Sequence, residues 1–280
     1  MLGAIIGDIV GSYYEVLEII YQREHRIHRP YEERIKILDK NTPLFTSDCS
    51  YTDDTVLTCA IYDAIINGNK DYAKYLKEYG LKEINLGLDK YGRSRFGKGF
   101  VEWVHGDYQG NSYGNGSAMR MSPVGYLFNS LEEVKKEAYN ATIPSHNHID
   151  AINGATAIAE AIYLLRTGFT KEEIKEYIEN NYYSLDYDLV DLQHNNRFSS
   201  KALVTVPQAI YMFLISDSFE DCIRKSISIG GDTDTIACMA GSLAESYYGV
   251  PEDIKVRTKK YLSKDIYNLI KGEYYERRSK

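Results

Sequence analysis

Two short acidic segments carry the strongest chemical signal in this chain of 280 residues. They read Thr52-Asp53-Asp54-Thr55 and Gly231-Asp232-Thr233-Asp234-Thr235, and each stands directly before apolar residues at helical spacing. If folding brings the two segments together, their carboxylate and hydroxyl oxygens form the hard ligand set that Mg²⁺ prefers. Carboxylates so close together repel one another unless a cation lies between them. We therefore expect a site for one or two divalent cations.

Helix capping is the simpler explanation of either segment alone. Thr and Asp side chains accept hydrogen bonds from the free N–H groups at a helix start, and the helix dipole favours acidic residues there. A cap needs only one good acceptor, however, whereas each segment contains two aspartates, and a Gly-Gly pair precedes the second one. The repetition favours a metal site over two ordinary caps.

Three other features have the residue types of a binding site but are weak signals when each is taken alone. Residues 106–116 form a Gly-rich loop whose backbone N–H groups suit phosphate or ribose oxygens. His146 and His148 are two positions apart, which is no standard helical metal pair and is more typical of a polar helix cap. Glu15 follows Gly11, where we expect the first helix to end, and a lone glutamate is usually solvated.

Helical periodicity is found nearly everywhere along the chain, and strand alternation almost nowhere. Apolar residues recur at helical spacing from Leu2 to Val10 and after both acidic segments. Further helices are expected at 71–79, 95–105, 131–141, 148–167, 170–180, 203–215, 218–228 and 252–270. We predict an all-α fold, and since no Pro-, Gly- or Ser-rich linker divides the chain, we expect residues 1–280 to form a single domain.

Composition excludes several classes of protein. A net charge of −7 argues against general affinity for nucleic acid or anionic membranes. The four cysteines form no Cys-x-x-Cys motif, and Cys59 and Cys238, which fall within apolar helical stretches, are typical of buried thiols in a reducing cytoplasm. The N-terminal segment lacks the basic region of a signal peptide, and no apolar run approaches the roughly 20 residues of a membrane span. We expect a cytoplasmic protein.

Five blocks, taken in order, resemble the signature segments of the ADP-ribosylglycohydrolase family. Five blocks in the correct order are far more specific than any one of them, and the resemblance runs from about Leu2 to Gly249. The blocks are Gly7-Asp8-Ile9-Val10-Gly11-Ser12-Tyr13-Tyr14-Glu15, Tyr51-Thr52-Asp53-Asp54-Thr55, Ser112-Tyr113-Gly114-Asn115-Gly116-Ser117-Ala118-Met119-Arg120, Ser145-His146, and Gly230-Gly231-Asp232-Thr233-Asp234-Thr235.

The resemblance implies a compact, orthogonal multi-helix bundle with a binuclear Mg²⁺ centre at the bottom of a cleft, where Mn²⁺ often substitutes. Glu15 would organise the substrate ribose or its attacking water, and His146 would contact the distal part of ADP-ribose. The implied metal ligands are Thr52, Asp53, Asp54, Asp232, Asp234 and Thr235. The implied cradle for the diphosphate and ribose is Ser112, Tyr113, Gly114, Asn115, Gly116 and Ser117.

The implied reaction is hydrolysis of the bond that joins ribose C1″ to an acceptor atom, with release of ADP-ribose. The substrate would be an ADP-ribosylated protein, with arginine the favoured acceptor, or a small ADP-ribosyl compound. Asp53, Asp54 and Glu15 all remain candidates for the general base. Two alternatives are an inactive ADP-ribose-binding or structural relative, and a phosphoesterase that would release AMP. Ser12-Tyr13-Tyr14 before Glu15, and Ser117 where glycine is common, depart from the family pattern and leave acceptor preference open.

Overall fold

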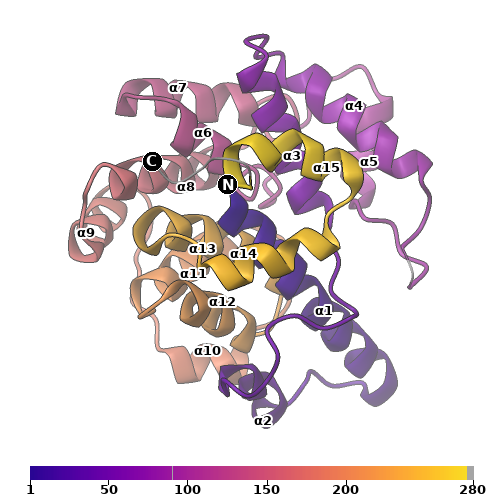
Figure 1. The fold of residues 1–280 in the computed structure, drawn as a ribbon, viewed down its shortest axis with the longest axis vertical. Helices are drawn as coiled ribbons and strands as arrows, with labels where there is room; N and C mark the ends of the chain where they lie inside the picture. Colours follow the sequence, from indigo (N-terminus) through magenta and orange to yellow (C-terminus); the bar gives the residue numbers. More distant parts are fainter. Residues whose placement is uncertain (90, 276–280) are drawn as a thin grey trace.

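The computed structural model describes residues 1–89 and 91–275, and helices make up most of that part of the chain (Figure 1). The described residues contain no β-sheet; two isolated bridges join Asn111 to His146 and Gly114 to Lys201. The elements are α1 (Leu2–His25), α2 (Tyr31–Arg34), η1 (Ile35–Leu38), α3 (Asp53–Ile66), α4 (Tyr72–Asn85), α5 (Lys98–His105), α6 (Ser122–Leu127), α7 (Leu131–Thr142), α8 (Ile149–Arg166), α9 (Lys171–Asn181), α10 (Leu189–Asn195), α11 (Ala202–Leu214), α12 (Phe219–Ser228), α13 (Thr233–Tyr248), α14 (Glu252–Thr258), η2 (Lys259–Tyr261) and α15 (Lys264–Tyr274). The predicted all-α fold is confirmed.

Helices α1 and α13 pack backbone against backbone along a row of glycines. A Cβ atom added to Gly3, Gly7 or Gly11 would lie 2.2, 1.9 or 2.4 Å from a carbonyl oxygen of α13. Gly3, Gly7 and Gly11 are four residues apart, so they share one face of α1, and only glycine permits so close an approach. The contact brings Asp8 on α1 next to the start of α13, where the second acidic segment lies.

The other helices surround this central pair (Figure 1). Helix α13 also packs against α8, α11 and α12, while α3 packs against α1, α4 and α6. The start of α3, which carries the first acidic segment, is thereby placed beside α1. Helix α14 crosses in front of α1 in this view, and α15 lies beside α3 (Figure 1).

Two expectations about element boundaries were wrong. The first helix does not end near Gly11 but continues to His25, so Glu15 lies on a helix and not in a loop. Gly11 serves close packing against Thr233 of α13 and does not terminate the helix. The stretch 252–270 is broken into α14, η2 and α15, because Ser263 caps a new helix by accepting a hydrogen bond from the Ile266 N–H. The short helices α6 and α10 were not predicted.

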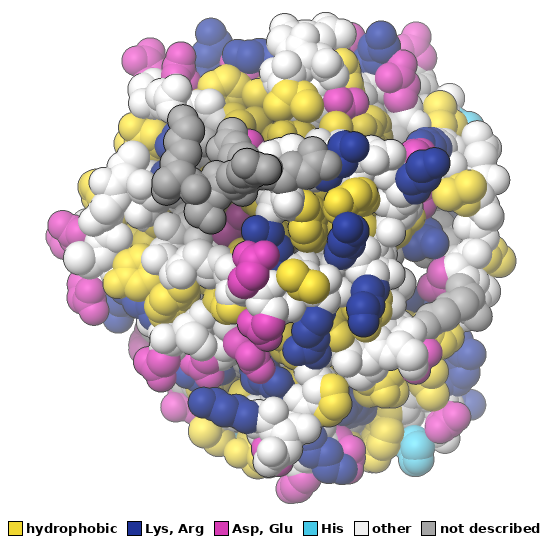
Figure 2. Space-filling model, viewed as in Figure 1, with side chains coloured by type: hydrophobic (Ala, Val, Ile, Leu, Met, Phe, Trp, Pro, Cys, Tyr) yellow, Lys and Arg dark blue, Asp and Glu magenta, His cyan; other side chains and the backbone are white. Residues whose placement is uncertain are grey.

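The predicted burial of Cys59 and Cys238 is confirmed, Cys49 and Cys222 are buried as well, and no disulfide forms among the described residues. Within the described residues, none of the helices combines the length and apolar character that crossing a membrane requires. On the face shown in Figure 2, Lys and Arg side chains lie among Asp, Glu and apolar ones.

Candidate functional site

A cavity of about 720 Å³ opens between the start of α3, the start of α13 and two loops. Its floor contains the acidic segments, and its walls contain the loop before α5 and the Gly-rich loop before α6. The volume is in the range typical of small-molecule sites. Many carboxylates line it, so the cavity suits a ligand that brings positive charge or hydroxyl groups.

Asp8 holds the start of α3 in place. Its carboxylate accepts hydrogen bonds from the backbone N–H of Thr52 and of Thr55, at 2.9 and 3.0 Å, and from both threonine hydroxyls. These are N–H groups that a helix start leaves without an intrahelical partner. The buried Asp8 carboxylate on α1 thus accepts hydrogen bonds from backbone N–H groups at the start of α3. The side chains of Asp53 and Asp54 line the cavity.

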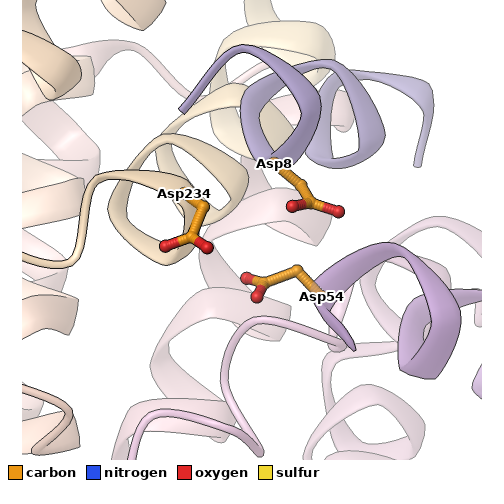
Figure 3. Close-up of side chains that lie close together, drawn as sticks. All are labelled: Asp8, Asp54 and Asp234. Carbon is orange, nitrogen blue, oxygen red and sulfur yellow. The ribbon is translucent and has the colours of Figure 1, made fainter. Parts of the chain in front are cut away.

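Three aspartates from three helices point toward one another at the floor of the site (Figure 3). Asp8 comes from α1, Asp54 from α3 and Asp234 from α13, and one oxygen atom from each lies within 4.8 Å of the other two. All three side chains are buried. The hydroxyls of Thr52 and Thr235 each lie 3.3 Å from Oδ2 of Asp54.

A second carboxylate triplet adjoins the first. It consists of Glu15, Asp232 and Asp234, again with oxygen atoms within 4.8 Å of one another. Asp234 belongs to both triplets and so links two adjacent groups of ligand atoms. Asp53 lines the same cavity but belongs to neither triplet. The predicted ligands of both acidic segments thus lie in one place, together with Asp8, which was not predicted as a site residue.

Two glycines, Gly230 and Gly231, form the tight turn that precedes α13. Gly230 and Gly231 have positive φ angles of 68° and 80°, which side-chain-bearing residues rarely adopt. The turn directs Asp232 toward the Gly-rich loop, where its Oδ2 accepts a hydrogen bond of 2.8 Å from Nδ2 of Asn115. Asn115 therefore ties the candidate substrate loop to the candidate metal site.

Burial and mutual repulsion raise the pKa values of the carboxyl groups in this site. Burial, reinforced by the neighbouring Asp234 carboxylate, raises the pKa of Glu15 to about 8. Burial and the Glu15 charge raise the pKa of Asp232 to about 7. The pKa values of Asp53, Asp54 and Asp234 are raised well above the usual range by burial and by the surrounding carboxylates. Positive charge placed among these groups would restore their ionised form.

The donor set fits a divalent cation. Oδ1 of Asp54 is buried and receives no hydrogen bond from the described residues. Buried carboxylate oxygens are almost always paired, and an orphaned one that faces two further carboxylates is a natural metal ligand. The hydroxyls of Thr52 and Thr235 add neutral oxygen donors to the same group.

The Gly-rich loop is held in shape by hydrogen bonds to two other segments. The N–H groups of Gly110 and Ser112 donate to the carbonyls of Pro144 and Ser145, and the N–H of Asn115 donates to the Ser200 carbonyl. Among the predicted cradle residues, four line the cavity: Ser112, Gly114, Asn115 and Gly116.

The other two cradle residues do not line the cavity. Tyr113 is 51% exposed and lies beside His148, with the ring centroids 5.8 Å apart. Ser117 is fully buried and donates a hydrogen bond to the Ala151 carbonyl on α8. These positions give Ser117 a structural contact and place Tyr113 on the outside of the loop.

His146 lines the cavity and is oriented by a buried arginine. Arg120 donates a 2.9 Å hydrogen bond to Oγ of Ser145, and that hydroxyl lies 2.7 Å from Nδ1 of His146. If the Ser145 hydroxyl accepts from Arg120 and donates its own hydrogen to Nδ1, the ring proton of His146 resides on Nε2. Burial and the Arg120 charge lower the pKa of His146 well below its usual value, so the ring is neutral.

The absence of a side chain at Gly116 leaves space beside Nε2 of His146. A Cβ atom there would lie 3.0 Å from Nε2 of His146. The neutral ring thus presents an N–H to the space beside the Gly-rich loop, where an oxygen of a ligand can accept it.

Arg93 brings a positive charge to the rim of the acidic cavity. Its Nη1 lies 3.2 Å from Oε2 of Glu15 and its Nε lies 3.1 Å from Oδ2 of Asp89. The arginine comes from the segment between α4 and α5, a part of the sequence without a recognisable motif. The local sequence therefore contains no signal that predicts a role for Arg93.

Asp8 and Arg120 were also missed, although both stand inside recognised blocks. The available signal for Asp8 was a single acid in an otherwise apolar helical face, among Ile5, Ile6, Ile9 and Val10. A charged residue in such a position is rarely buried without a specific partner. The corresponding signal for Arg120 was weaker, because its neighbours are not uniformly apolar.

The fold and the site define an all-helical enzyme with an acidic cavity between two helix starts. The sequence matches the family described as ADP-ribosylglycohydrolase over residues 1–279. The chain belongs to this family, whose members are hydrolases of N- or O-glycosyl bonds.

Individual relatives are distant but cover nearly the whole chain. ADP-ribosylhydrolase ARH3 of Mus musculus is 29% identical over 316 residues, which span 90% of this chain and 83% of the mouse protein. ADP-ribosylarginine hydrolase Tri1 of Pseudomonas putida is 26% identical and spans 89% of this chain and 70% of its own length. A solved ADP-ribosylglycohydrolase-related protein complex shares the fold, with a TM-score of 0.64, 18% identity, and coverage of 96% and 93% of the two chains.

Proposed function

We propose that this protein is a Mg²⁺-dependent hydrolase that cleaves the bond between ribose C1″ and its acceptor in ADP-ribosylated substrates. The observation that carries the proposal is the position of Asp234, which belongs to two adjoining carboxylate triplets on the floor of a ligand-sized cavity. Divalent cations bound at this floor would offset the repulsion among the carboxylates of both triplets. The residues proposed to hold them are Thr52, Asp53, Asp54, Asp232, Asp234 and Thr235, with Mn²⁺ able to replace Mg²⁺.

Bound cations would supply the positive charge that orients the ribose hydroxyls and makes a nearby water more acidic. The protein side chains would hold the cations and position the helix starts that carry their ligands. Asp8 keeps the start of α3 in position through its four hydrogen bonds, and the threonine hydroxyls complete the ligand set. Carboxylates around the sugar also favour the positive charge that develops on the ribose ring as the glycosidic bond weakens.

Among the three candidates for the general base, the structure favours Glu15. Its side chain lines the cavity next to the carboxylate triplets and reaches the rim, where it pairs with Arg93. In the reaction, a water oxygen forms the new bond to C1″ while the bond from C1″ to the acceptor breaks. Glu15 takes one proton from the water and returns a proton to the departing acceptor, so ADP-ribose and the free acceptor are the products.

The Gly-rich loop and His146 are proposed to bind the ADP portion. Gly114 and Gly116 leave the backbone open to close approach, and the Nε2–H of His146 can donate to a phosphate or ribose oxygen. Arginine is the acceptor that we favour, because one relative is named an ADP-ribosylarginine hydrolase. The acidic rim formed by Glu15 and Asp89 suits a cationic acceptor.

Product release tests the proposal directly. Purified protein is incubated with arginine-linked, serine-linked and O-acetyl-linked ADP-ribose, in Mg²⁺ and again in EDTA, and the products are resolved by mass. Intact ADP-ribose released only with metal supports the hydrolase and identifies its acceptor. Release of AMP would indicate a phosphoesterase. Binding of ADP-ribose without turnover of any substrate would favour the inactive relative.

A further inference from the structure

Arg93 sits between two carboxylates on the wall of the cavity. Its Nη1 is 3.2 Å from Oε2 of Glu15, and its Nε is 3.1 Å from Oδ2 of Asp89. The Glu15 and Asp89 side chains are only 16% and 14% exposed, so this guanidinium lies in a site with limited solvent. Such a pair of carboxylates matches the planar fork of guanidinium donors.

The loop that carries Arg93 is shaped around Asp89. Oδ1 of Asp89 accepts hydrogen bonds of 2.8 Å from the backbone N–H groups of Tyr91 and Arg93. The N–H of Asp89 donates to the Arg93 carbonyl, also at 2.8 Å. Oδ1 of Asp89 therefore binds the loop backbone, and Oδ2 binds the Arg93 guanidinium. The subsite is held by backbone contacts and does not depend on Arg93's own side chain.

Glu15 connects this subsite to the reaction centre. The same side chain that pairs with Arg93 also contributes an oxygen atom to the triplet with Asp232 and Asp234. The Gly-rich loop and His146, proposed to take the ADP portion, belong to a different segment of the cavity wall. The acceptor must leave from ribose C1″ near the carboxylate floor, and the Glu15–Asp89 pair is a group beside that floor that already holds a guanidinium.

We propose that Glu15 and Asp89 form the subsite for the acceptor guanidinium, and that Arg93 is an internal occupant that an arginine-linked substrate must displace. This inference rests on the proposed function. A guanidinium attached to ribose remains a cation, so it competes with Arg93 for the same two carboxylates. A neutral acceptor, such as a serine hydroxyl or an acetyl ester, leaves Arg93 in place. Arg93 therefore sets the preference between cationic and neutral acceptors.

Replacing Arg93 with glutamine removes the competitor. In Mg²⁺, we expect the KM for arginine-linked ADP-ribose to fall about fivefold in Arg93→Gln, a size suited to a partly exposed ion pair. The KM for O-acetyl-ADP-ribose should change little. Asp89→Asn introduced into the Arg93→Gln protein should return the arginine-linked KM to the wild-type value or above it. An equal change with both substrates, or no change with either, overturns the proposal.

Arg95→Gln is the matched control, because Arg95 lies on the same loop. Its Nη1 donates to the Tyr51 carbonyl at 3.0 Å and its Nε lies 3.5 Å from Glu83, so it anchors the loop elsewhere. The Arg95→Gln protein should keep the wild-type ratio of the two KM values. If Arg95→Gln shifts the ratio of the two KM values as much as Arg93→Gln does, the shift arises from a disturbed loop and the proposal fails.

Agmatine binding separates this inference from the proposed function. Agmatine is a small guanidinium compound, and calorimetry can measure its affinity in Mg²⁺ without any turnover. Tighter binding to Arg93→Gln than to wild type, lost again when Asp89→Asn is added, supports the subsite even if no ADP-ribosyl substrate is cleaved. Unchanged agmatine affinity in Arg93→Gln contradicts the subsite even if the enzyme is active.

Discussion

The carboxylate of Asp8 accepts hydrogen bonds from the backbone and the hydroxyl of Thr52, at 2.9 and 2.7 Å, although the two residues are 44 positions apart. This contact joins α1 to the start of α3. The glycine row of α1 joins the same helix to α13, with Gly11 against Thr233 at the start of α13. Helix α1 is therefore the element on which both acidic segments are aligned.

Asp8→Ala should weaken both stability and metal binding. The substitution leaves two backbone N–H groups and two hydroxyls of the Thr52–Thr55 turn without their acceptor, which should cost about 1–3 kcal/mol of unfolding free energy. Urea unfolding in Mg²⁺ measures the loss, and calorimetry measures the affinity for Mg²⁺. Ser12→Ala is the control, because it removes from the same helix α1 a hydroxyl that accepts a hydrogen bond from the Ser50 N–H. Wild-type affinity for Mg²⁺ in Asp8→Ala would show that α3 is positioned by other contacts.

The stability of the metal-free protein should fall as the pH rises from about 5 to about 8. Folding raises the pKa of Glu15 to about 8 and that of Asp232 to about 7, so the folded state binds more protons than the unfolded chain in this window. Deprotonation therefore favours the unfolded state. Urea unfolding in EDTA at several pH values measures the slope. Saturating Mg²⁺ should abolish or reverse it, because cations bind the ionised carboxylates. Equal slopes with and without Mg²⁺ would argue against a metal site.

Gly7→Ala should destabilise the protein by about 1–3 kcal/mol, as overpacking of a tight contact does. The added Cβ would lie 1.9 Å from the Ala237 carbonyl oxygen and would force α1 away from α13. Gly272→Ala is the matched control, since Gly272 lies in α15 with open space around it. That change should stabilise the helix by about 0.5–1 kcal/mol. Thermal unfolding of the two variants compares the effects, and a tolerated Gly7→Ala would refute the backbone contact.

Ser145→Ala should weaken the binding of ADP-ribose about fivefold, a loss typical of one hydrogen bond. Without the hydroxyl, nothing in the Arg120–Ser145 relay keeps the proton of His146 on Nε2. Nitrogen NMR of the His146 ring reports the tautomer, and calorimetry reports the affinity. Thr142→Val is a nearly isosteric control in the same buried region, where the described residues provide no partner for the Thr142 hydroxyl. If His146 keeps the wild-type tautomer in Ser145→Ala, the Arg120–Ser145 hydrogen bonds do not determine which ring nitrogen carries the proton.

Glu15→Gln should lower kcat about 100-fold or more, within the range for a lost general base, while Mg²⁺ still binds. The amide keeps the shape of the side chain but takes no proton from water. Single-turnover release of ADP-ribose and Mg²⁺ calorimetry together test the assignment. Loss of Mg²⁺ binding would instead make Glu15 a metal ligand, and full activity would transfer the base role to Asp53 or Asp54.

Local patterns were sufficient to predict the helical fold and most of its helices. Apolar spacing and short-range capping depend on residues within a few positions of one another, so they can be read from the chain directly. The same reasoning placed the end of the first helix at Gly11, because glycine terminates helices in sequence more often than it packs them. Gly11 instead contacts α13, more than 200 residues later in the chain, and that contact is invisible to local spacing.

The sequence by itself determined the candidate ligands, since two segments of paired aspartates need neighbouring positive charge wherever they meet. Only the tertiary structure decided that Asp8 caps α3 from another helix, that Asp234 is shared by two carboxylate triplets, and that Arg93 occupies the rim beside Glu15. Each of these relationships joins helices or loops that are distant in sequence. They arise because α1 and α13 approach closely enough, through glycine, to bring the acidic helix starts around one cavity.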